Sequence, residues 1–117
     1  MPEYFTDTEL RCKCGCGLEN TTSLHKSMLY TARELAGISF VVTSGSRCEK
    51  HNKEVGGKPN SDHLTGEGTD IKCTVSGNRF IILEAAIKAG FTRIGIGKTF
   101  IHLGSSEKHP QEVIWLY

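Results

Sequence analysis

The segment spanning residues 45–70 most constrains the fold, because it is long and poor in apolar residues in a chain of only 117. It holds Pro59, Asn60 and five glycines, which are Gly45, Gly56, Gly57, Gly66 and Gly68. These residue types favour turns and interrupt helices and strands. We therefore predict that the segment is mostly loop, and a long loop in so small a domain is usually functional.

Hydrophobic periodicity predicts helices and strands on both sides of this loop. In chain order we expect a helix over 21–36, a strand over 38–43, a strand over 69–75, a helix over 78–89, and three short strands over 93–97, 99–103 and 113–117. The second helix should place Phe80, Leu83 and Ile87 on one face. The closing strands are too close together for parallel crossovers, which need about a dozen residues. The prediction is one α+β domain over 1–117, with two main helices, a small, largely antiparallel sheet and a glycine-rich loop.

The charge and hydropathy patterns argue against two classes of partner. The formal net charge is +1, from 14 basic and 13 acidic residues, and no block of Lys and Arg occurs. Proteins that bind nucleic acid electrostatically carry a basic face or stripe, so no nucleic-acid partner is expected. No segment approaches the roughly 20 apolar residues that cross a bilayer, so no membrane partner is expected either. The first ten residues contain Glu3, Asp7 and Glu9 and no apolar run, which predicts synthesis in the cytoplasm without a signal peptide.

The chemistry in the loop centres on His63 and Asp70, with Gly66 and Gly68 between them. A loop bent at these glycines and leading into a strand can turn both side chains toward one point. Neutral histidine and ionised aspartate are zinc ligands, and His102, in a strand-like apolar run, is the best third one. Three protein ligands with one open coordination position are typical of catalytic zinc. The alternative for the loop pair is an ordinary hydrogen bond.

Residues 43–71 resemble the zinc D-Ala-D-Ala carboxypeptidase and L-alanyl-D-glutamate endopeptidase family, which has a hedgehog/DD-peptidase-like fold. In that family, Ser-Gly-x-Arg precedes Ser-x-His-x-x-Gly-x-Ala-x-Asp, and a later histidine completes the site. The similarity covers nearly the whole chain, including the Cys-x-Cys-Gly-Cys run near the start and the Val-Ile-Trp-Leu-Tyr ending. It is closest in kind to the short forms encoded by bacteriophages and prophages.

The resemblance implies roles for individual residues. His63, Asp70 and His102 would bind one Zn²⁺, Arg47 would bind substrate, and Ser61 would orient substrate or a ligand. The alternatives are a surface salt bridge for Arg47 and a turn-stabilising hydrogen bond for Ser61. The implied activity is a zinc metallopeptidase that hydrolyses stem or cross-link peptides of peptidoglycan. Such a protein would act at the bacterial cell wall as a phage endolysin, or within a virion beside other phage virion or lysis proteins. The alternative is a zinc-binding structural or virion module of the same fold that has lost catalysis.

The general base is the weak point of the resemblance. Relatives carry an acidic residue three positions before the last zinc histidine or two positions after it, where this chain has Thr99 and Gly104. A zinc peptidase needs a group that takes a proton from water and passes it to the leaving nitrogen. Glu67, between the first two predicted ligands, is the first candidate for a catalytic base. Other candidates are Glu107, His51 and His109.

The five cysteines have no assigned role in this prediction; they are Cys12, Cys14, Cys16, Cys48 and Cys73. An odd number without a secretion signal does not indicate a disulfide framework. Structural zinc sites usually use C-x2-4-C spacing, which the alternating run at 12–16 lacks. We therefore favour reduced structural thiols over a second metal site, and consider a redox role the least favoured.

Overall fold

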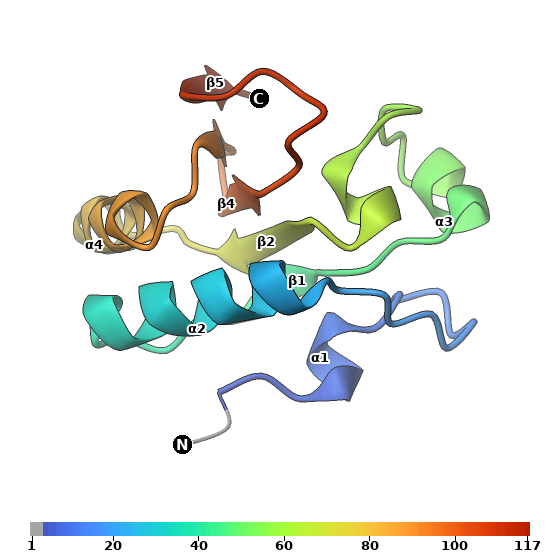
Figure 1. The fold of residues 1–117 in the computed structure, drawn as a ribbon, viewed down its shortest axis with the longest axis horizontal. Coiled ribbons are helices and arrows are strands. Elements are labelled where there is room, and N and C mark those ends of the chain that lie inside the picture. The colour runs from blue at the N-terminus through green and yellow to red at the C-terminus, as the bar shows by residue number, and fades with distance from the viewer. Residues whose placement is uncertain (1–3) are drawn as a thin grey trace.

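The computed structural model describes residues 4–117 and places one sheet against two long helices (Figure 1). In chain order the elements are α1 (Asp7–Leu10), α2 (Ser23–Ala36), β1 (Val42–Ser44), α3 (Glu49–Glu54), the 3-10 helix η1 (Asp62–Thr65), β2 (Gly68–Lys72), α4 (Ser76–Lys88), β3 (Arg93–Ile96), β4 (Phe100–Gly104) and β5 (Val113–Leu116). The α+β class with two main helices is confirmed. Helix α2 ends at Ala36 as predicted and begins two residues later than predicted, with Thr22 accepting a hydrogen bond at the N-cap and Gly37 in the left-handed conformation at the C-cap.

The sheet has the order β1-β2-β4-β3-β5 and is antiparallel except between β3 and β5. The prediction of a largely antiparallel sheet is confirmed. The expectation that the closing strands could not pair in parallel was wrong for β3 and β5. Strand β4 lies between them in the sequence, so residues 97–112 supply a connection long enough for parallel pairing.

The helices cover one face of the sheet and leave the other face open for a site. Helices α2 and α4 lie beside each other, and they bury apolar side chains together with alternate residues of the strands. The central members of this core are Leu29, Ala32, Ile71, Ile82, Ala86, Ile94, Ile101 and Leu103. Because side chains alternate along a strand, the neighbours of these strand residues point to the opposite face.

The shared face predicted for α4 is only partly used in packing, because Leu83 packs against the core and its two neighbours on that face do not. Phe80 is 67% exposed and Ile87 is 53% exposed, whereas Ile82, Ala85 and Ala86 are buried. Apolar residues occur around most of this helix, so the pattern did not single out one face. The two alanines allow α4 to approach its neighbours closely, and tertiary packing decides the orientation.

Two further boundaries differ from the prediction. The loop over 45–70 contains the short helices α3 and η1, which bring their polar residues to fixed positions. Strand β1 begins only at Val42, later than expected, although Phe40 before it is buried in the core.

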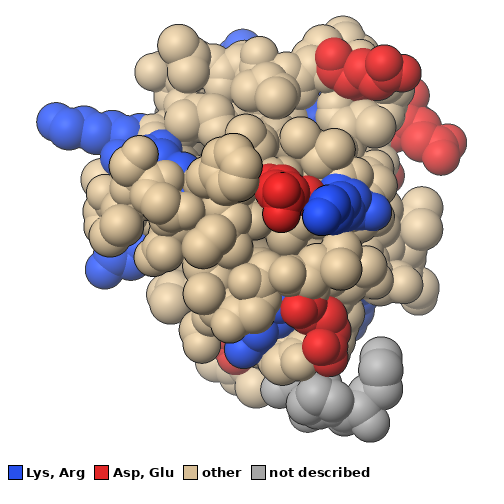
Figure 2. Space-filling model, turned by 90° about the vertical axis from the view of Figure 1, so that its left-hand side faces the viewer, with Lys and Arg blue, Asp and Glu red and all other residues tan. Residues whose placement is uncertain are grey.

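The charged side chains on the surface and the apolar character of the helices bear on possible partners. On the face drawn in Figure 2, Lys and Arg side chains lie singly or beside Asp or Glu. Within residues 4–117, no helix is both long enough and apolar enough to cross a lipid bilayer.

Candidate metal centre and substrate cleft

Three side chains from separate elements meet on the open face of the sheet: His63 from η1, Asp70 from β2 and His102 from β4. Asp70 and His102 are directly opposite each other in the antiparallel pair of β2 and β4. Asp70 points away from the helices because its neighbour Thr69 points toward them, where its hydroxyl contacts His25 of α2. One ligand atom from each of the three residues lies within 4.8 Å of the others.

The spacing of the three donor groups suits a single zinc ion. His63 Nε2 lies 3.2 Å from Asp70 Oδ1, and His102 Nδ1 lies 2.8 Å from the same oxygen. Tetrahedral ligands at about 2.0–2.1 Å from zinc are about 3.3 Å apart. The donors also match zinc chemically, because imidazole nitrogen and carboxylate oxygen are its usual non-thiol ligands.

Hydrogen bonds outside the cluster leave the correct nitrogen of each ring free. His63 Nδ1 lies 2.7 Å from the carbonyl oxygen of Gly45, so its N–H donates there and Nε2 stays available. His102 Nε2 lies 3.2 Å from Asp62 Oδ2, which leaves Nδ1 available. Outer partners of this kind fix the tautomer and the orientation of metal-binding histidines.

The carboxylate of Asp70 is held in the ionised form that binds metal. Burial by itself would raise the pKa of Asp70, but hydrogen bonds from His102 and His63 and the charges of both rings hold it well below the usual range. The ionised carboxylate is the form that binds metal, whereas the two rings must first release the protons that they share with Asp70, because only a neutral imidazole is a ligand.

Asp62 is a site residue that sequence reasoning missed. Its side chain is nearly fully buried and lies 3.2 Å from both His102 Nε2 and Arg93 Nε. Burial by itself would raise the pKa of Asp62. The hydrogen bond from His102, the charge of that ring and the charge of Arg93 lower it instead. The family pattern leads one to expect a carboxylate at position 104. A Cβ atom on Gly104 would collide with Asp62 Oδ2, so glycine there lets the Asp62 carboxylate reach the cluster instead.

The cluster lies at the base of a cleft of about 950 Å³, into which Arg47 also projects. Arg47 is 9% exposed, and its guanidinium donates to Asn52 Oδ1 and Ser44 Oγ, each at 3.0 Å. One of its terminal nitrogens lies 3.9 Å from Asp70 Oδ2, and its Nε has no hydrogen-bond partner. The structure therefore brings Arg47 to the three clustered residues, as a fixed positive charge facing the cleft.

Comparison with known proteins agrees with this geometry. A family model described as peptidase M15 matches residues 3–104. The chain belongs to the peptidase M15 family. Members of this family are zinc peptidases, and the matched range contains the whole three-residue cluster. A comparison with curated protein sequences found no match to the chain.

Ser61 has a structural contact in this M15 chain and also borders the cleft. Its hydroxyl oxygen accepts the backbone N–H of His63 at 3.2 Å and so caps η1. The side chain also lines the cleft. The hydrogen bond to the backbone of His63 helps to position that residue of the cluster. Substrate binding by Ser61 stays a prediction.

The structure does not bring Glu67 to the cluster of the M15 site. Glu67 is not among the clustered donors and does not line the cleft, and the hydroxyl of Thr65 donates to its Oε1 at 2.5 Å. Of the other candidate bases, Glu107 is exposed and His51 does not line the cleft, whereas His109 does. His109 Nε2 lies 3.7 Å from Asp62 Oδ1, which has no hydrogen-bond partner.

The closing residues of the chain form one wall of the cleft. Trp115 and Tyr117 line it, and the Trp115 ring lies 5.6 Å from the ring of His102. A side chain at Gly95, on the neighbouring strand β3, would collide with both aromatic rings. The alternation of β5 could have indicated this wall, because Val113, Trp115 and Tyr117 fall on one face.

Proposed function

We propose that the chain is one zinc peptidase domain that hydrolyses stem or cross-link peptides of bacterial peptidoglycan. One Zn²⁺ would be held by His63 Nε2, a carboxylate oxygen of Asp70 and His102 Nδ1. The observation that carries the proposal is the convergence of these three donors at the base of a cleft, beside the charged Arg47. Three protein donors are typical of catalytic rather than structural zinc.

The residues of the chain supply binding and orientation. Zinc, when bound, supplies a Lewis acid that polarises a peptide carbonyl and makes water more acidic. The Arg47 guanidinium would bind a carbonyl or terminal carboxylate of the peptide, because its planar fork suits either group. Asn52 and Ser44 fix that fork before substrate arrives, which reduces the entropy lost on binding.

His109 is our choice for the group that carries the proton. An imidazole accepts and donates a proton near neutral pH, and His109 lines the cleft beside Asp62. The partnerless Oδ1 of Asp62 would accept the N–H of His109, which orients the other ring nitrogen for exchange with water or the leaving nitrogen. Asp62 then acts as a positioning residue for both His102 and His109.

The biological setting belongs to the same proposal. The resemblance to short phage and prophage forms supports a role as a cell-wall lytic protein, either an endolysin or a component of a virion. In either role its site of action is the bacterial cell wall. The M15 match supports a peptidase and leaves the phage role and the bond that is cut to experiment.

A second candidate is a zinc-binding module that has lost catalysis. The absence of a carboxylate at Thr99 and Gly104 favours it, because these are the positions where relatives place the general base. Fold alone does not decide between the two functions. The peptidase and the binding module differ in whether His109 and Asp62 replace the missing carboxylate in catalysis.

The deciding experiment is digestion of purified peptidoglycan by the zinc-loaded protein, followed by mass analysis of released peptides. We expect new peptide termini that disappear with a chelator and return when zinc is restored. The masses identify the bond that is cut. Full zinc occupancy with no released peptide would replace the peptidase with the binding module.

A further inference from the structure

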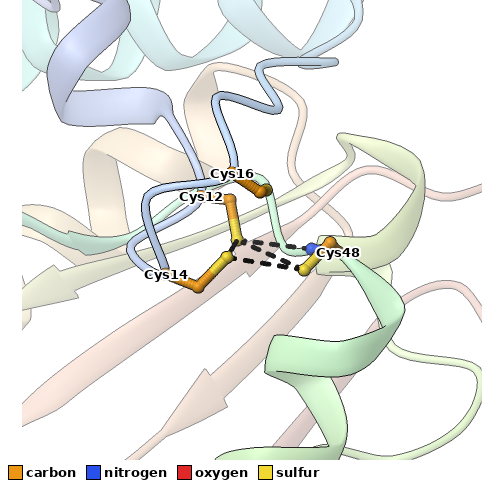
Figure 3. Close-up of side chains that lie close together, drawn as sticks. All are labelled: Cys12, Cys14, Cys16 and Cys48. Atoms are coloured by element: carbon orange, nitrogen blue, oxygen red, sulfur yellow. Dashed lines mark hydrogen bonds between the residues drawn. The ribbon is translucent and has the colours of Figure 1, made fainter.

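Four cysteines from two distant segments of the chain converge outside the cleft cluster. Cys12, Cys14 and Cys16 belong to the turn after α1, and Cys48 immediately precedes α3 (Figure 3). The sulfur of Cys12 lies 3.5 Å from that of Cys14 and 3.8 Å from that of Cys48, and Cys14 and Cys48 are 3.6 Å apart. The sulfur of Cys16 completes a group in which all four atoms lie within 4.8 Å of one another.

The backbone explains how an alternating run can converge. Gly15 and Gly17 have φ values of 88° and 86°, in the left-handed region that favours glycine. The N–H of Cys12 donates to the carbonyl of Leu18 at 2.8 Å and closes the turn. The alternating run therefore turns its cysteines toward one point, where an extended strand would not, and Cys48 joins them from a distant segment.

The sulfur separations fit a tetrahedral metal site. Four thiolates at about 2.3 Å from zinc lie about 3.8 Å apart. A disulfide brings two sulfurs to about 2.05 Å. The three measured separations, 3.5–3.8 Å, match the first arrangement.

Backbone donors also point at the sulfurs. The N–H of Cys48 lies 3.4 Å from Cys12 Sγ, and the N–H of His51 lies 3.4 Å from Cys48 Sγ. Such bonds stabilise negative charge on sulfur, and the thiolate is the form that binds metal.

We propose that Cys12, Cys14, Cys16 and Cys48 bind a second zinc ion. Four protein thiolates fill the coordination of the ion, so this site is structural and takes no part in hydrolysis. It joins the N-terminal turn to the segment that carries Arg47, next to Cys48 in the chain. A backbone hydrogen bond from the N–H of Ser46 to the carbonyl oxygen of Leu10, at 2.8 Å, joins the same two segments. The proposal rests on the cysteines alone and does not depend on the proposed peptidase activity.

The first test counts zinc per folded chain by elemental analysis. The variants are Cys14→Ser/Cys16→Ser, whose positions are exposed, and His63→Ala/His102→Ala, which removes the cleft donors. Cys73→Ala is the matched control, because Cys73 is a free cysteine outside the cluster. We expect about two zinc ions in the parent and in Cys73→Ala, and about one in each double variant. Zinc content unchanged in the Cys14→Ser/Cys16→Ser variant would overturn the proposal.

A second measurement covers the case in which the cysteine variant fails to fold. Cobalt(II) exchanged into the unmutated protein should show the near-ultraviolet charge transfer from thiolate to metal and the visible bands of a tetrahedral ion. The His63→Ala/His102→Ala variant should keep both signals, because they come from the sulfur site. A folded parent that takes up cobalt without thiolate charge transfer, or that shows a disulfide among the four cysteines by peptide mass, would refute the site. Loss of zinc from the cleft alone would count against the proposed function and leave this inference standing.

Discussion

The two clusters differ in what holds their ligands in place. His63 and His102 are each 3% exposed and stand on η1 and β4, and the pairing of β4 with β2 fixes the distance from His102 to Asp70. In the cysteine cluster, Cys14 and Cys16 are exposed and belong to a turn held by few backbone bonds. The first cluster is organised by the fold, whereas the proposed second ion would itself help to hold the turn.

This difference predicts separate consequences for the loss of each ion. Where the fold preorganises the ligands, removing the metal removes chemistry and leaves the surrounding structure in place. Where the ligands sit on a turn, much of the binding free energy of the metal is folding free energy. The cleft cluster should therefore control activity, and the cysteine cluster should control stability.

The largest expected effect is on activity, in the His63→Ala variant. It should lose the cleft zinc and at least about 10²-fold in peptidoglycan cleavage, since even outer partners of a metal site are worth about 10–100-fold. Released peptides and zinc content are measured on the same samples. The Cys14→Ser/Cys16→Ser variant should retain cleavage to within about tenfold, less than loss of an outer partner costs. If the two variants lose activity equally, the separation of roles between the clusters is wrong.

The next largest expected effect is on the Tm, and it should depend on whether the cysteine cluster is intact. Zinc at about a hundred times its Kd stabilises a site by about 2.7 kcal/mol, or roughly 10 °C in Tm for a domain of this size. A chelator should lower the Tm of the parent by more than that of Cys14→Ser/Cys16→Ser, which keeps only the cleft zinc, and the difference should be about this amount. Equal shifts in the parent and in the cysteine variant would place the stabilising ion in the cleft.

Arg47 lies beside Asp70 of the cleft cluster and precedes Cys48 of the cysteine cluster in the chain. Its substitution tests whether it binds the peptide. Arg47→Lys keeps the charge but loses the planar guanidinium that Asn52 and Ser44 hold, so KM should rise by at least about 10-fold, near the lower limit for a hydrogen bond to a charged group. The zinc content should stay at the parental value, which is the control. An unchanged KM would show that Arg47 does not contact the peptide. The Arg47→Ala variant is less informative, because it also leaves Asn52 Oδ1 without its donor.

The free energy of unfolding should depend on pH through His25, which contacts Thr69 on the helix side of the sheet. Burial lowers the pKa of His25 to about 3, with smaller contributions from the charges of His102 and His63. In the unfolded chain a histidine titrates near 6.5, so between these values the unfolded state binds the extra proton. Stability should therefore fall as pH falls below about 6.5, by about 1.4 kcal/mol per pH unit from this residue.

The His25→Gln variant isolates that contribution. Glutamine cannot titrate, so the difference in free energy of unfolding between parent and variant should shrink as pH falls from 6.5, by about 1.4 kcal/mol per pH unit. Both proteins are measured without metal, so that loss of zinc at low pH does not enter. A difference that stays constant with pH would mean that His25 is not held neutral by its burial.

The sequence predicted the parts of the site that depend on local pattern. The spacing of His63 and Asp70 and the strand pattern around His102 pointed to three residues that the structure brings together. Contacts between distant segments carried no such signal. Asp62 reaches the cluster only because Gly104 leaves room for it, and Cys48 meets the N-terminal turn across 32 or more residues.

The smallest expected effect is that of Glu67→Gln, which tests the base that the sequence favoured. Glu67 does not line the cleft, and its Oε1 accepts a hydrogen bond from the hydroxyl of Thr65, which the amide oxygen of glutamine can also accept. The variant should therefore cleave peptidoglycan within about twofold of the parent, whereas loss of a general base costs about 10²–10⁴. His109→Gln is the matched substitution inside the cleft and should show the larger loss. If the order is reversed, with Glu67→Gln inactive and His109→Gln active, the proton passes through the loop between the cluster residues, and His109 has no role in catalysis. Zinc content in both variants should equal that of the parent, because neither side chain belongs to the donor set.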